Sequence, residues 1–187
     1  VDLWVARLKT ALQEKYPTLE FAPREGATIS VIEVPKAFKY KHKGFMRTLI
    51  RGLTYLFTLQ WPQLSQLCRV TVGIEKDPYD FYQTLIDYFQ THKLYPTFFF
   101  LVGDYNYYDQ GLSYNNVKYK YLIKHVADYA IVSILGSYDA ISQQETMMKE
   151  RERMINIINR PVRRFRANNN LLPLPELYRN LADSECK

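Results

Sequence analysis

The stretch that decides the fold class is Thr97-Phe98-Phe99-Phe100-Leu101-Val102, which is apolar at five consecutive positions after its threonine. An exposed strand alternates apolar and polar residues, whereas a strand that is covered on both faces does not. A run of this length is typical of a central strand in a parallel sheet. It therefore predicts an α/β protein in which helices pack against the sheet.

Outward from this run, strand-like and helix-like patterns alternate along the chain. Strands are predicted at 28–34, 68–72, 97–102, 130–135 and 161–166. Helices are predicted at 2–15, 45–60, 80–90, 115–129, 143–159 and 174–183. Five strand-then-helix units predict βαβ crossovers in a single domain spanning 1–187, with a parallel sheet that is open or closed into a barrel. Ligand sites of such folds lie in the loops that leave the carboxyl ends of the strands, here 33–43, 73–80, 103–114, 135–140 and 166–172.

Composition excludes several classes of function. The chain has 187 residues and a formal net charge of +6, but its basic residues are dispersed and accompany no nucleic-acid-binding motif. No apolar run approaches the roughly 18 residues of a membrane span. Cys68 and Cys186 form no metal-binding pattern, and no nucleophile elbow or phosphate-binding loop is present. We therefore expect no nucleic-acid partner, no membrane span and no acyl-enzyme chemistry.

Three segments carry a resemblance to a known family. They are Lys76-Asp77-Pro78-Tyr79-Asp80, the region from Phe99 through Asp104-Tyr105 to Tyr114, and Pro173-Leu174-Pro175-Glu176-Leu177-Tyr178-Arg179-Asn180-Leu181. These segments resemble bacterial polysaccharide deacetylase-like proteins of carbohydrate esterase family 4, in a subgroup associated with surface polysaccharides of Bacteroidetes. The resemblance implies a distorted (β/α) barrel, of which this chain is a part. It leaves the compartment open between the bacterial cytoplasm and the cell envelope.

The resemblance also implies a chemistry whose residues this chain lacks. Related enzymes hold a divalent metal such as zinc with one aspartate and two histidines, while a second aspartate acts as the base. The matching positions here are Val31 for the base, Glu33 for the metal carboxylate, and Leu135 and Asn168 for the two histidines. Valine accepts no proton and leucine binds no metal. We therefore expect no catalytic residues, no bound metal and no other cofactor.

We expect the protein to keep a saccharide-binding surface although it lacks the catalytic residues, since tyrosines stack on sugar rings without a metal. The candidate residues are Asp77, Asp104, Tyr105, Tyr108, Asp109, Ser137, Tyr138 and Arg166. For the aspartates, turn formation competes with this interpretation, because Asp77 precedes a proline and the other two lie in a long loop.

Two other functions stay open at this point. One is an active carbohydrate deacetylase or hydrolase that uses Glu33 and the loop aspartates with altered metal ligands. The other is a protein-interaction module that uses the aromatic loop 105–114. The chain starts at Val1 and stops after the segment around Tyr178, where similar proteins continue, so we expect a fragment truncated at its C-terminal end. Its open sheet edge is then expected to be covered by self-association or by a partner.

Overall fold

A parallel sheet forms the centre of the protein. The computed structural model describes residues 2–19, 21, 29–168 and 175–183. In these residues the strands are β1 (Val31–Val34), β2 (Thr97–Leu101), β3 (Ile131–Gly136) and β4 (Phe165–Ala167). Neighbouring strands pair in parallel in the order β1-β2-β3-β4, and the sheet curls into a half-barrel. The predicted α/β fold with parallel strands in a partial barrel is confirmed.

β2 is buried along its whole length, as its continuous apolar run predicts. Phe98 and Phe100 point to the face of the sheet that helices cover, where they join the largest apolar cluster. Phe99 and Leu101 point to the opposite face and pack with Leu135 of β3. Both faces of the strand are therefore covered, which explains why no polar residue interrupts the run.

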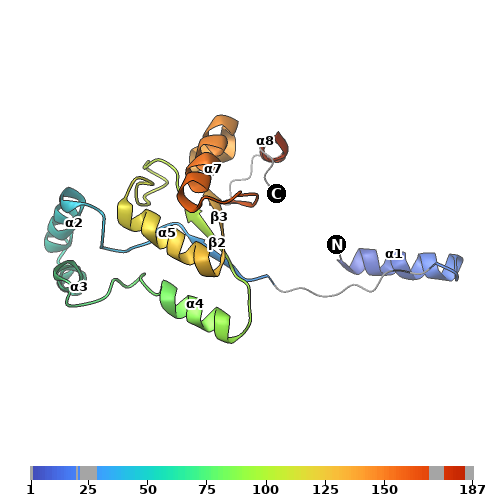
Figure 1. Cartoon of the computed structure of the whole chain (residues 1–187), viewed down its shortest axis with the longest axis horizontal. Coiled ribbons are helices and arrows are strands. Elements are labelled where there is room, and N and C mark those ends of the chain that lie inside the picture. The colour runs from blue at the N-terminus through green and yellow to red at the C-terminus, as the bar shows by residue number, and fades with distance from the viewer. Residues whose placement is uncertain (1, 20, 22–28, 169–174, 184–187) are drawn as a thin grey trace.

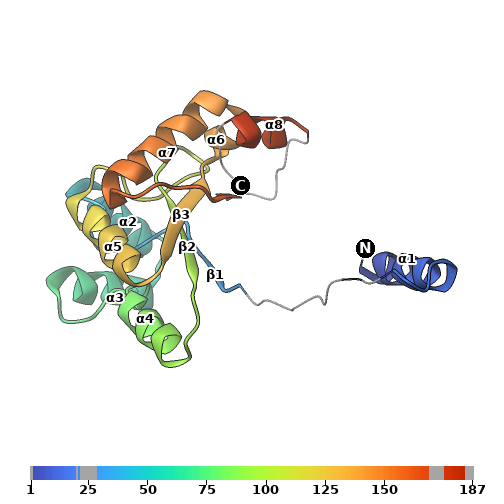
Figure 2. The same ribbon diagram turned by 45° about the vertical axis from the view of Figure 1, so that its right-hand side comes forward.

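Most of the helices lie on one side of this sheet (Figures 1 and 2). They are α1 (Asp2–Lys15), α2 (Phe45–Phe57), α3 (Trp61–Val72), α4 (Tyr82–Thr91), α5 (Val117–Tyr129), α6 (Tyr138–Ser142), α7 (Gln144–Ile158) and α8 (Glu176–Asp183). α4, α5 and α7 contribute apolar side chains to the main cluster on one face of the sheet. α1 stands apart from the sheet and exposes large apolar side chains such as Trp4, which is 81% exposed. None of the described helices is long and apolar enough to span a membrane.

The predicted strand at 68–72 is wrong, because these residues form the last turns of α3. Three β-branched residues, Val70-Thr71-Val72, suggested a strand. The apolar positions Leu64, Leu67 and Val70 nevertheless recur every third residue, and Leu67 and Val70 are buried on one helical face. Pro62, at the first helical turn, is also compatible with a helix start. The sheet therefore has four strands among the described residues, where the sequence predicts five.

Other boundaries also differ from the expected ones. The helix predicted at 45–60 ends at Phe57, and α6 was not predicted. The last strand, expected at 161–166, is the shorter segment Phe165–Ala167. It pairs with the end of β3, where a Cβ on Gly136 would lie 2.0 Å from the ring of Phe165. Only glycine allows the phenylalanine ring to pass so close to the end of β3.

Candidate functional site

The loops that follow β2, β3 and β4 meet at a buried carboxylate. Asp109 is 2% exposed, and its Oδ2 accepts a hydrogen bond from the backbone N–H of Tyr138 at 2.7 Å. Its Oδ1 accepts a hydrogen bond from the Nδ2 of Asn168 at 2.9 Å. Three of the residues selected from sequence are therefore in direct contact. Both oxygens of Asp109 are engaged, so this aspartate holds the loops together rather than presenting a free base.

Asn106 organises the same loop and was not selected from sequence. Its Oδ1 accepts hydrogen bonds from the backbone N–H groups of Tyr108 at 2.9 Å and Asp109 at 2.6 Å. Its Nδ2 donates to Asp139 at the start of α6, at 3.1 Å. The bond from the N–H of Tyr108 closes an Asx turn, which an asparagine in a loop favours, so this signal was available in the sequence.

Two tyrosines form an aromatic surface beside this network. The rings of Tyr108 and Tyr138 stack with centroids 4.2 Å apart and planes 21° from parallel. Tyr107 meets the edge of Tyr108 at 5.3 Å. Tyr108 is 60% exposed and Tyr107 84% exposed, so aromatic faces and edges are open to solvent next to the ends of the strands.

An ion pair occupies the position that the resemblance assigns to the metal carboxylate. Glu33 on β1 accepts a hydrogen bond from the Nε of Arg166 on β4, and the two strands are the outer ones of the described sheet. Both side chains remain partly accessible, at 36% and 50%. The arginine neutralises the carboxylate and takes part of its coordination capacity.

The side chains at the metal positions do not fit a zinc site. Leu135 is fully buried between Phe99 and Leu101 and has no ligating atom. Asn168 turns its amide nitrogen toward Asp109, and Glu33 is paired with Arg166. Val31, at the position of the base, is 43% exposed. Within the described residues no group of three or more histidine, cysteine, aspartate or glutamate side chains is placed to hold a metal ion. We derive no step through a metal at this site.

Four other residues selected from the sequence either lie outside the Asp109 network or bind backbone groups. Asp104 pairs with Arg153 of α7 at 3.0 Å, and Tyr105 lies under the guanidinium of Arg47, 3.9 Å from the ring centroid. Ser137 is the N-cap of α6, and its hydroxyl accepts a hydrogen bond from the N–H of Ala140. Asp77 is 3% exposed and lies in the connection between α3 and α4.

Asp77 ties two loops together. Its carboxylate accepts hydrogen bonds from the backbone N–H groups of Lys39, Tyr40 and Lys41 at 2.7 to 2.9 Å, and from that of Tyr79 at 3.0 Å. Burial by itself would raise the pKa of Asp77, but these four donors outweigh burial and hold the pKa below its usual value. The hydrogen bond from the N–H of Tyr79 to Asp77 closes the turn that the sequence Asp77-Pro78 suggests.

Behind the site lies a buried acid that sequence reasoning missed. Glu150 of α7 is completely buried, and its Oε2 accepts a hydrogen bond from the backbone N–H of Ser137 at 3.2 Å. Its Oε1 has no hydrogen-bond partner among the described residues. Burial raises the pKa of Glu150 to about 7. Glu150 lies within a run of consecutive charged residues, but its spacing of three from Met147 and four from Met154 places it on their helical face, and this signal was available in the sequence.

Comparisons with known proteins give a limited result. No protein-family model matches the sequence, and no curated protein matches it either. Among solved structures, the fold is similar to that of a polysaccharide deacetylase from Bacillus cereus, with a TM-score of 0.42 and 16% sequence identity. The similarity covers 59% of this chain and 53% of the other, so it spans about half of the deacetylase. A likeness at this level carries no argument about catalysis or ligands.

Proposed function

We propose that the protein binds a polysaccharide at the carboxyl ends of its strands and does not deacetylate it. The observation that carries this proposal is the stacked pair of the exposed Tyr108 and the partly buried Tyr138, whose backbone N–H is held by the carboxylate of Asp109. Aromatic faces that are fixed before a sugar arrives bind it with little loss of conformational entropy. Asp139 and Arg166 are exposed polar side chains of the same strand ends and supply hydrogen-bonding groups for hydroxyls.

The residues at the metal and base positions are the reason why we expect no deacetylation. Deacetylation of the kind that the sequence resemblance implies needs a metal, a base and an open coordination position. Here the metal carboxylate is paired with Arg166, one histidine position holds buried Leu135, and the base position holds Val31. We infer a degenerate relative of the deacetylases, with a role in binding or scaffolding in the metabolism of bacterial surface polysaccharides.

A binding experiment tests the first half of the proposal. The purified protein is applied to an array of bacterial glycans, and the strongest ligand is then titrated by calorimetry. Tyr108→Ala should weaken binding about tenfold, because an aromatic face buried against a sugar contributes roughly 1.5 kcal/mol. Tyr95→Ala is the matched control, since Tyr95 is 84% exposed at the opposite end of β2. Absence of any glycan ligand, or equal effects of both variants, would leave scaffolding as the better account.

An acetate-release assay tests the second half. On acetylated oligosaccharides the protein should release no acetate, with or without added zinc. The double variant Leu135→His and Asn168→His should stay inactive, because Val31 still provides no base and Arg166 still pairs with Glu33. Adding Val31→Asp is expected to be necessary for activity. Acetate release by the double variant alone would show that the base lies elsewhere.

A further inference from the structure

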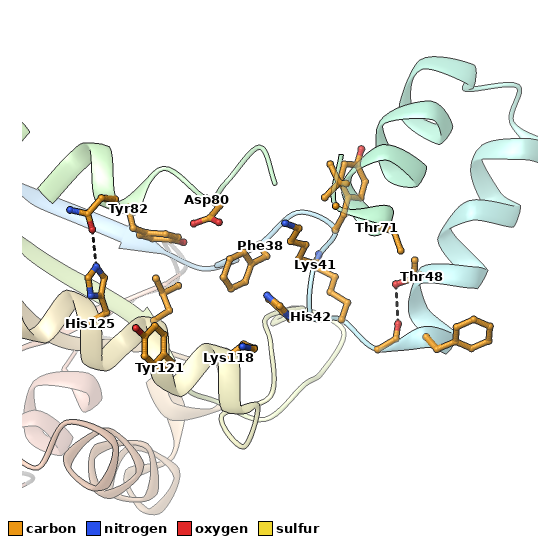
Figure 3. Close-up of a pocket in the computed structure, with 18 residues that line it drawn as sticks. Phe38, Lys41, His42, Thr48, Thr71, Asp80, Tyr82, Lys118, Tyr121 and His125 are labelled. Carbon is orange, nitrogen blue, oxygen red and sulfur yellow. Dashed lines mark hydrogen bonds between the residues drawn. The ribbon is translucent and has the colours of Figure 1, made fainter. Parts of the chain in front are cut away.

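A large cavity lies away from the tyrosine surface, between the loop that follows β1 and helices α3, α4 and α5 (Figure 3). Its volume is about 790 Å³, which is within the range of small-molecule sites. No residue of the Asp109 network or of the Tyr108–Tyr138 pair lines it. The cavity therefore calls for an explanation that is separate from polysaccharide binding.

Positive charge gathers around this cavity from two separate parts of the chain. Lys41 and Lys43 come from the loop after β1, and Lys118 comes from the first turn of α5. Within the described chain, none of these three ammonium groups has a salt bridge or a hydrogen-bond partner. Asp80 is the single carboxylate of the lining residues, so the cavity has a surplus of positive charge.

The surplus of positive charge affects the pKa of His42, which lies in the loop after β1. The ring of His42 packs against the edge of Phe38 with centroids 4.9 Å apart, and Figure 3 shows Lys41 and Lys118 near it. Burial lowers the pKa of His42, and the charges of Lys118 and Lys41 lower it further. Asp77 and Asp80 act in the opposite direction but do not cancel the effect. Burial, together with the charges of Arg51 and Lys36, likewise lowers the pKa of Lys43 to about 8.

Two contacts fix the cationic loop in this position. Asp77 holds the backbone N–H of Lys41, and the Nδ2 of Asn116 donates to the carbonyl oxygen of His42 at 3.0 Å. His42 itself has a φ of 61°, a left-handed conformation that non-glycine residues adopt only when the surroundings stabilise it. The loop is therefore held with its like charges close together, at an electrostatic cost that an anionic ligand would offset.

We propose that this cavity binds a phosphorylated small molecule, with the phosphate between Lys41, His42 and Lys118. The cationic lining is made of lysine and histidine, and lysine is a frequent phosphate ligand that acts as a point charge. The rings of Phe38, Tyr82 and Tyr121 supply an apolar wall for the rest of the ligand. This site is independent of the polysaccharide surface, and its test does not involve a glycan.

Calorimetric titration with pyrophosphate tests the proposal. The full chain should bind it, and Lys41→Gln and Lys118→Gln should each weaken binding by about tenfold, as expected for loss of a charged hydrogen bond. Neither side chain has a hydrogen-bond or ion-pair partner among the described residues, so the variants should fold with unchanged melting temperatures. Lys124→Gln is the matched control, because Lys124 is an exposed residue of the same helix and does not line the cavity. Absence of binding at low salt, or an equal loss in the control, would overturn the proposal.

A second measurement, the pKa of His42, tests whether the anion binds beside this ring and does not depend on the affinity. The pKa of His42, followed by NMR of its ring proton and assigned with His42→Gln, should rise when pyrophosphate is added, because a nearby anion favours the charged imidazole. An unchanged pKa at saturating pyrophosphate would place the anion elsewhere and would contradict the proposal. Glucose 1-phosphate and vesicles containing phosphatidic acid then distinguish a soluble ligand from a lipid headgroup, with glucose as the neutral comparison.

Discussion

At the scale of single residues, Glu150 couples stability to pH. Its pKa is about 7 in the folded protein against 4.5 as the reference value, so between these pH values the folded state binds more protons than the unfolded state. The free energy of unfolding should therefore fall as pH rises from 4.5 to 7, by roughly 3 kcal/mol from this group alone. Below pH 4.5 both states carry the protonated acid, and the contribution is constant.

Glu150→Gln tests this expectation. The amide keeps an oxygen for the N–H of Ser137 and carries no charge at any pH, so the variant should be more stable than the unaltered protein at pH 8 and close to it at pH 5. Urea unfolding at the two pH values measures the difference. Glu152→Gln, an exposed substitution on the same helix, is the control. Parallel pH profiles for the unaltered protein and Glu150→Gln would mean that Glu150 is ionised in the folded state at neutral pH.

At the scale of elements, Asp77 joins the loop after β1 to the connection between α3 and α4. Asp77→Asn replaces an oxygen that accepts backbone hydrogen bonds with an amide that donates, so several N–H groups lose their acceptor. We expect the free energy of unfolding to fall by roughly 2 to 4 kcal/mol. Chemical denaturation measures this loss.

Asp80→Asn provides the comparison for that change, because Asp80 is exposed three residues further on and its side chain holds no backbone group of the loop. It should alter the stability by less than about 0.5 kcal/mol. If the two variants were equally stable, the four hydrogen bonds of Asp77 would contribute little, and the loop would be positioned by the packing of Phe38 and Tyr40.

At the scale of the whole molecule, stability should decrease from the centre of the sheet outward. β2 is buried along its whole length and β3 at every position after Ile131, whereas α1 stands apart and α2 has no buried residue. Hydrogen exchange followed by mass spectrometry should give the slowest exchange in 97–101 and 132–136 and fast exchange in 2–15. Protection of α1 equal to that of β2 would show that this helix docks on another surface, such as a second copy of the chain. The outer strands β1 and β4 are where we expect self-association or a partner to cover the sheet.

Local patterns in the sequence were sufficient for most of the sheet and its main helices. The continuous apolar run of β2, the apolar spacing of α5 and the turn at Asp77-Pro78 are properties of neighbouring residues, and each has one favourable local structure. They also imply that the polar loops meet at the carboxyl ends of the strands, which the contacts of Asp109 with Tyr138 and Asn168 confirm. The segment at 68–72 was misjudged because its β-branched residues favour a strand locally, and the buried face of Leu67 and Val70 overrides that preference.

Only the tertiary structure decided which groups touch across the sheet. The ion pair between Glu33 and Arg166 joins residues 133 positions apart, and no local pattern indicates that the arginine meets that carboxylate. The hydrogen bond from the N–H of Ser137 to Glu150 depends on the packing of α7 against the end of β3. The cationic cavity likewise exists because Asp77 and Asn116 hold a loop of lysines against the first turn of α5. The sequence determined which elements form, because local preferences and burial patterns are short-ranged, whereas charge pairing and cavities depend on distances that exist only once those elements pack.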